Sequence, residues 1–414
     1  MSDDLGFPPR RALPDDVRDR LRAEVRQGIG KRRPKHAWYA AAAAVLVLAA
    51  GAVVVPRQLR QPAETPPAVA GGLKLDVKLA TAALDRCWAA VKAAGKTDRV
   101  PPRADWVPLF TDELSGDAVV AATAAGKPMF CETTETTVTL SDPGATPAYA
   151  PGSRSGLLLQ SATGLVGGVL DPAWPEAGLI VVSPGSSGGN DLEFSPVSRQ
   201  FVVLTRSAPE RTQLVLVDHG AGPPRKVDLP PAPAPLLSVT DRPDPAERTS
   251  PAGRALGECL ADAEEVIPDG AAYRPGPLLV EDDYQVVLGR RGDRVVVCTR
   301  EPDHRRPGKT QARAYPDLVA DRQVPARTLR VSTLGATEAG GEPGKSRTPF
   351  AATVPLTAAS VSVGFGGGVS AEGAAVDGMF IVWVPKERYE TGVNVSVVAR
   401  DVRGTVVYEG ELPL

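Results

Sequence analysis

Histidine, cysteine and aromatic residues are scarce in this sequence. The 414 residues include only 3 His and 4 Cys, and 5% are aromatic. A hydrolytic Ser-His-Asp set therefore has few ways to form, and there is no Cys-x-x-Cys pair of the kind that binds zinc. The net charge of −2 excludes a global field that would hold nucleic acid. We expect no cofactor, no metal site and no nucleic-acid partner.

Glycine and proline are abundant, with 41 of each. This composition is typical of a turn-rich β protein, and the length allows two or three domains. Short Val-rich segments bounded by Gly, Asp or Pro predict strands in the C-terminal half. These segments are residues 285–288, 294–298, 329–331, 361–364, 379–384, 393–398 and 405–409. Arg291-Gly292-Asp293, between the first two segments, predicts a hairpin tip.

One long apolar run, AWYAAAAAVLVLAAGAVVV at residues 37–55, contains no charged residue. Its length is close to the roughly 20 residues that cross a bilayer. A Lys- and Arg-rich stretch at 31–36 precedes it, and positive flanks stay inside. The sequence therefore predicts a single-pass protein of the cell membrane with a cytoplasmic N-terminus and extracytoplasmic C-terminal modules. A cleavable signal peptide is the alternative, because Ala50-Gly51-Ala52 has the small residues of a cleavage site.

The predicted cytoplasmic tail, residues 1–36, contains one amphipathic segment. Residues 13–27 read LPDDVRDRLRAEVRQ, with early acidic residues and glycines just beyond the end, which predicts a short helix. Its apolar stripe is formed by Leu13, Val17, Leu21 and Val25. An isolated helix of this length is marginal in water, so the stripe is a candidate partner-binding surface. The alternative is a solvated stub.

The N-terminal layout resembles a family. LPDDVRDRLRAEV, a basic run, an Ala/Val-rich span and a Pro-rich stretch are similar to actinobacterial single-pass membrane proteins of the anti-sigma-factor type. The resemblance covers about the first 60 residues and implies a cytoplasmic sigma factor as partner. Zinc-binding members carry a His and a Cys-x-x-Cys pair in this part, whereas the first cysteine here is Cys87.

The rest of the chain is divided by two Pro-rich stretches, residues 56–72 and 230–252, which we interpret as linkers. They separate module 1 (73–229) from module 2 (253–414). Similar segments recur in the two modules, which predicts an internal duplication. The matched segments start at Leu84 and Leu256, at Ala177 and Ala359, and at Phe201 and Phe380.

The four cysteines follow the same repeat. Cys87 and Cys131 lie in module 1, and Cys259 and Cys298 lie in module 2. Of three possible connectivities, Cys87–Cys131 with Cys259–Cys298 is the one that repeats. We predict structural disulfides, since a metal site or reactive thiol needs clustered ligands.

No motif for catalysis is complete. The Ser-Gly-Gly core of residues 185–190 resembles a serine-protease nucleophile loop, but that family places its histidine before the serine. Here His36 precedes the predicted membrane span, and His219 and His304 follow the serines. A turn is the better interpretation of 185–190. The acidic clusters 262–265 and 281–283 do not follow the spacing of a calcium loop.

These observations predict an α+β fold class: one transmembrane helix, then two disulfide-linked β-rich modules, each with a short helix on an antiparallel sheet. The predicted function is a non-enzymatic envelope protein whose paired modules bind a protein, peptide or cell-wall ligand. Two alternatives stay open. One is an anti-sigma-like regulator that acts through its tail, and the other is a cell-wall hydrolase that uses Ser187.

Overall fold

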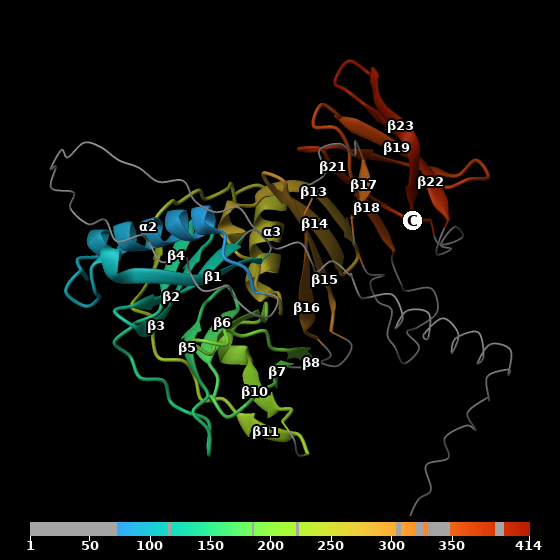
Figure 1. The fold of residues 1–414 in the computed structure, drawn as a ribbon. Helices are drawn as coiled ribbons and strands as arrows, with labels where there is room; N and C mark the ends of the chain where they lie inside the picture. Colours follow the sequence, from blue (N-terminus) through green and yellow to red (C-terminus); the bar gives the residue numbers. More distant parts are fainter. Residues whose placement is uncertain are drawn as a thin grey trace, which may run out of the picture. The chain divides into compact units, whose positions relative to one another are not determined.

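The computed structural model describes residues 73–114, 117–183, 186–220, 223–303, 308–318, 326–329, 331, 348–385 and 393–414. Within them it contains two α-helices, three 3-10 helices and strands that form six sheets (Figure 1). The 3-10 helices are η1 (Arg103–Asp105), η2 (Pro209–Arg211) and η3 (Gly270–Ala272). We call residues 73–240 the first half and residues 251–414 the second half.

The first half opens with helix α2 (Val77–Ala93), which begins where the Asp76 carboxylate accepts from the Leu79 backbone N–H. The helix contacts a five-stranded antiparallel sheet of order β1-β2-β3-β4-β12. The strands are β1 (Trp106–Leu114), β2 (Asp117–Ala124), β3 (Lys127–Thr133), β4 (Thr137–Leu140) and β12 (Leu237–Thr240). Strand β12 lies inside the stretch 230–252 that we interpreted as a linker, so part of that stretch completes this sheet.

Two smaller antiparallel sheets complete the first half. One has the order β5-β6-β9 and the other the order β11-β10-β7-β8. Their strands are β5 (Gly156–Gln160), β6 (Leu165–Val169), β7 (Ala177–Ser183), β8 (Ser186–Asp191), β9 (Gln200–Leu204), β10 (Gln213–Asp218) and β11 (Arg225–Asp228). The buried Gln200 amide donates to the carbonyls of Ala122 and Met129, which links β9 to the five-stranded sheet.

The second half opens with helix α3 (Pro251–Asp262), capped by Ser250, whose hydroxyl accepts from the Gly253 N–H. Figure 1 shows α3 beside the antiparallel sheet β13-β14-β15-β16. Its strands are β13 (Arg274–Glu281), β14 (Tyr284–Arg291), β15 (Arg294–Pro302) and β16 (Thr310–Leu318). The hairpin between β14 and β15 turns at Gly292 and Asp293, the tip that the sequence predicts.

Two more sheets follow, of order β17-β18-β21 and β20-β19-β22-β23. Their strands are β17 (Arg327–Thr328), β18 (Pro349–Thr353), β19 (Ser360–Gly364), β20 (Ser370–Ala374), β21 (Met379–Trp383), β22 (Asn394–Arg400) and β23 (Val406–Pro413).

The two halves share one strand order. In each, a helix precedes a four-strand meander, a three-stranded sheet and a four-stranded sheet, and the order β5-β6-β9 matches β17-β18-β21 strand for strand. Likewise β11-β10-β7-β8 matches β23-β22-β19-β20. The segments that start at Ala177 and Ala359 include β7 and β19, and these two strands hold corresponding places in their sheets.

The predicted α+β class is wrong. Strands dominate the described residues of both halves, and each half has a single α-helix of 17 or 12 residues. Because three antiparallel sheets per half bury most of the apolar side chains, the fold is mostly β. The helices are short attachments to the first sheet of each half.

The predicted membrane placement also needs correction. No helix among the described residues is long and apolar enough to cross a membrane, so the single-pass anchor has no support in the structure. The segment 37–55 lies outside the described residues, as do the tail 1–36 and the linker 56–72.

Candidate functional site

The residues of greatest electrostatic interest lie where the two halves meet. Asp269, in the second half, has a fully buried side chain. Its carboxylate accepts from the Thr134 hydroxyl at 2.5 Å and from the backbone N–H of Glu135 at 3.1 Å, both in the turn between β3 and β4. It also accepts from the Thr136 hydroxyl and N–H. The Asp269 carboxylate of the second half thus binds the β3–β4 turn of the first half through all three turn residues.

Arg291 supplies the positive charge for this carboxylate. Its guanidinium pairs with Asp269, lies 3.5 Å from the Glu135 carboxylate, and sits 5.4 Å from the centre of the Tyr273 ring. Burial alone would raise the pKa of Asp269, but the Thr134 and Thr136 hydroxyls and the paired Arg291 hold that pKa below its usual value. Asp269 is therefore charged, and its charge is neutralised locally.

Asp117, at the start of β2, is placed differently. Arg294 approaches its carboxylate only to 3.7 Å, and neither carboxylate oxygen has a hydrogen-bond partner among the described residues. Burial raises the pKa of Asp117 to about 7; Arg294 lowers it, while the charges of Glu132 and Asp269 raise it further. The group thus titrates near neutral pH.

Glu132, on β3, adds a second buried carboxyl group to this region. Its side chain accepts from the Thr163 hydroxyl, and burial raises its pKa above the usual range. Arg291 and Arg294, at the ends of the β14–β15 hairpin, face this acidic surface from the second half. The junction is therefore a charge-complementary contact. It also contains two carboxyl groups, of Asp117 and Glu132, whose charged forms are disfavoured by burial.

A cleft of about 540 Å³ lies between the halves. The first half contributes Ser183, Ser207 and Arg211, and the second half contributes Asp262, Glu264 and the start of β16. The backbone joins the halves beside it, since the Val266 N–H donates to the Arg206 carbonyl at 2.8 Å and Ser207 pairs with Glu265. The exposed Arg211 places a positive charge on one wall of the cleft. The exposed Asp262 and Glu264 place two carboxylates on the other wall.

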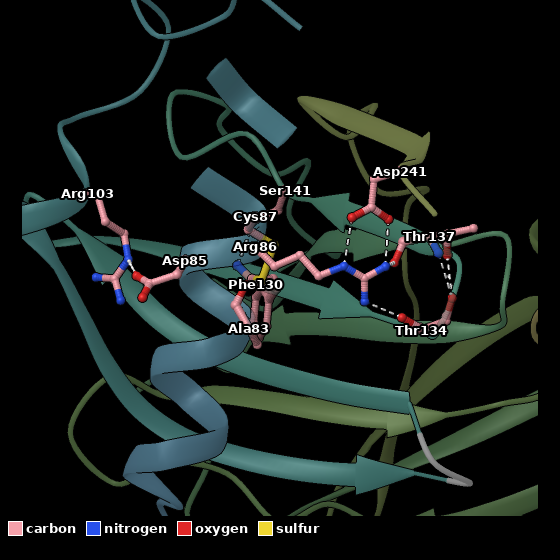
Figure 2. The surroundings of a disulfide bond; sticks show 11 residues. Ala83, Asp85, Arg86, Cys87, Arg103, Phe130, Thr134, Thr137, Ser141 and Asp241 are labelled. Atoms are coloured by element: carbon pink, nitrogen blue, oxygen red, sulfur yellow. Dashed lines mark hydrogen bonds and ion pairs between the residues drawn. A yellow bond between two sulfur atoms is a disulfide. The ribbon is translucent and has the colours of Figure 1, made fainter. Parts of the chain in front are cut away.

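The structure contains both predicted disulfides. Cys87 on α2 is bonded to Cys131 on β3, and Cys259 on α3 is bonded to Cys298 on β15, with all four side chains buried. Figure 2 shows the first bond and, beside it, Arg86. The Arg86 guanidinium pairs with Asp241 and donates to the carbonyls of Thr134 and Thr137. These contacts fix α2 to the end of β12 and to the turn that Asp269 also holds.

The Ser-Gly-Gly motif of residues 185–190 was predicted to be a turn, but the structure shows a strand there. Residues 186–191 form strand β8 rather than a turn, and Ser187 pairs with Val182. His219 adjoins the other end of the same sheet, where its N–H donates to the Glu176 carbonyl. Residues 177 and 182 of β7 are about 17 Å apart at strand spacing, so Ser187 and His219 do not meet. His304 lies outside the described residues.

The hairpin tip at Arg291-Gly292-Asp293 lies where the sequence predicts it, but the sequence does not indicate the junction between the halves. The local signals were two arginines that flank a two-residue turn and a Thr-Glu-Thr turn in the first half. Their pairing spans more than a hundred residues of sequence, so only the fold reveals it. The four apolar residues of the predicted tail helix, Leu13, Val17, Leu21 and Val25, lie outside the described residues.

Comparison with known proteins adds little. No protein-family model matches the chain, and no curated protein matches it. Among solved structures, the chain is similar to the native conformation of Escherichia coli alpha-2-macroglobulin, with 10% identity and a TM-score of 0.14. That match covers 73% of this chain and 28% of the other, so the chain spans less than a third of that protein's length. A similarity this weak carries no argument about fold or function.

Proposed function

We propose that this chain is a non-enzymatic binding protein whose two paired halves hold a polar peptide segment in the cleft between them. The observation that carries the proposal is the cleft itself, which both halves line and which has about 540 Å³ of space. Ligand sites often lie between domains and have a few hundred to a thousand Å³.

The charges of the cleft define the ligand class. Arg211 on one wall favours a carboxylate, while Asp262 and Glu264 on the other favour an ammonium or guanidinium group. Asp262 also pairs with Arg300, so Glu264 is the acidic group that we assign to the ligand. A peptide with one acidic and one basic side chain, or a free terminus of each sign, matches this arrangement.

The shared strand order of the halves supports the proposal. Each half brings one wall, and the junction ion pairs hold the walls at a fixed separation. The separation of Ser187 from His219 argues against the hydrolase alternative. The sigma-factor alternative depends on residues 1–36 and stays a prediction.

The test is a binding series with fluorescein-labelled hexapeptides that carry one Glu and one Lys at varied spacing, measured by fluorescence anisotropy with the full chain. We expect peptides of at least one spacing to bind. Arg211→Glu should weaken that binding about tenfold, because the attraction between Arg211 and the Glu side chain of the peptide becomes a repulsion.

Arg403→Glu is the matched control, since it makes the same charge change at an exposed turn of the second half. Equal effects of the two variants, or no binding by any spacing, would count against the cleft as the ligand site.

A further inference from the structure

Strand β8 forms one edge of the sheet β11-β10-β7-β8, and no other strand pairs with it among the described residues. Its exposed residues Ser187, Gly188 and Gly189 have short side chains or none. A Cβ at Gly188 would meet nothing within 4 Å, and one at Gly189 would meet only atoms of the neighbouring β7. The backbone of β8 is therefore open to a partner.

The pairing register shows which backbone groups are free. The Leu192 N–H donates to the Ala177 carbonyl at 2.8 Å, so these opposed residues form a hydrogen-bonded pair. Such pairs alternate along an antiparallel ladder, so residues 190 and 188 also bond to β7. The N–H and C=O groups of Ser187, Gly189 and Asp191 therefore point away from β7, toward the open edge.

Three other edge strands carry features that block such pairing. Strands β1 and β13 contain Pro108 and Pro275, each next to a register shift, and β11 carries Arg225 and Lys226. Proline, bulges and charge are the usual protections of a sheet edge. Strand β8 has no proline and no basic residue, and its register against β7 is continuous.

The corresponding strand of the second half packs one face against a neighbouring sheet. Strand β20 occupies the position of β8, but a Cβ at Gly373 would lie 3.0 Å from Val382 Cγ1 and 3.2 Å from the Ile381 carbonyl. Both atoms belong to β21 of the neighbouring sheet. The face of β20 at Gly373 is therefore packed, whereas the face of β8 at Gly188 is open.

From this geometry we infer that β8 is a dimerisation edge, on which β8 of a second copy of this chain pairs antiparallel about a two-fold axis at Gly189. In that register Gly189 meets Gly189, where no side chain obstructs the close approach. Ser187 of each copy stands opposite Asp191 of the other, a hydroxyl against a carboxylate. The three outward residues of each copy exchange roughly six backbone hydrogen bonds.

Self-complementarity favours a second copy over an unrelated strand. An antiparallel two-fold pairing keeps the two Asp191 carboxylates about 13 Å apart, at four residues' strand spacing, so like charges do not oppose each other. The short side chains limit the buried area, so we expect a weak dimer with a Kd in the micromolar range or above.

The test is sedimentation velocity of the full chain from about 1 μM to about 1 mM. Gly189→Pro removes an outward N–H that β7 does not use, so we expect the fold to persist and dimerisation to weaken at least tenfold. Gly188→Ala is the matched control, because the Gly188 backbone bonds to β7 and the added methyl group has open space. It is expected to dimerise as the parent does.

Ser187 variants test the register without proline. Ser187→Lys places an ammonium opposite each Asp191 and is expected to tighten the dimer about fivefold, and Ser187→Asp to weaken it by a similar factor. A chain that stays monomeric over the whole range would overturn the inference. So would a dimer that ignores Gly189→Pro, or one in which the two Ser187 variants behave alike. None of these outcomes bears on peptide binding in the cleft.

Discussion

Asp117 is a carboxyl group in a place that disfavours its charge. Arg294 is too distant to compensate fully for burial, and the pKa of Asp117 rises to about 7 from an ordinary 3.8. The folded state therefore binds this proton more tightly than the unfolded state does between about pH 4 and 7. In that window the free energy of unfolding falls as the pH rises, by up to about 4 kcal/mol in total.

Asp117→Asn removes this titration. We expect the variant to lose much of the decline in stability between pH 4 and pH 7, measured as urea midpoints at several pH values. Glu132, whose pKa burial also raises, leaves a residual slope of the same sign. Asp269, whose pKa lies below normal, contributes in the opposite direction and only under more acidic conditions. An unchanged slope in Asp117→Asn would contradict this account.

At the scale of elements, each short helix is held by one disulfide and by apolar packing. Helix α2 buries Ala80, Ala83, Leu84 and Cys87 against its sheet, a spacing of three and four residues that the sequence displays. The pairing of cysteines was predictable because each module contains two cysteines at a similar separation, 44 and 39 residues. The partner of Arg86 was not, because Asp241 lies 155 residues away in a stretch that reads as a linker.

Replacing the pair Cys87 and Cys131 by alanine is expected to reduce the free energy of unfolding by about 4 kcal/mol, because the bond closes a loop with a sequence separation of 44. The pair Cys259 and Cys298, with a separation of 39, is the matched comparison and should give a loss of similar size. Guanidinium denaturation of both double variants measures this. A loss below about 1 kcal/mol in either would show that the disulfide adds little to that helix.

At the scale of the whole molecule, the Asp269 junction couples the two halves. Asp269→Ala removes the acceptor of the Thr134 and Thr136 hydroxyls and leaves Arg291 buried without its main partner. We expect a loss of about 3 kcal/mol and, in calorimetry, a single unfolding transition that separates into two. Asp244→Ala, at an exposed position, is the control and should leave one transition. One transition in Asp269→Ala would show that other contacts couple the halves.

The sequence by itself determined several local features: the positions of six of the eleven described strands in the second half, the hairpin tip at Arg291-Gly292-Asp293, and the disulfide pairing. These follow from side-chain alternation, turn residues and a duplicated pattern, all of which act within one module. Two local interpretations of the sequence were wrong. The serine-glycine run at 185–190, interpreted as a turn, contributes strand β8, and the proline-rich stretch 230–252, interpreted as a linker, contains strand β12.

Only the tertiary structure decided the fold class, the burial of Asp117, the capture of the β3–β4 turn by Asp269, the cleft between the halves and the open edge of β8. Each depends on which surfaces meet. The free energy of a charge or a strand edge is set by what surrounds it, and those surroundings come from residues far apart in the chain. Composition and spacing record the groups themselves, and the fold supplies the environment that gives them their properties.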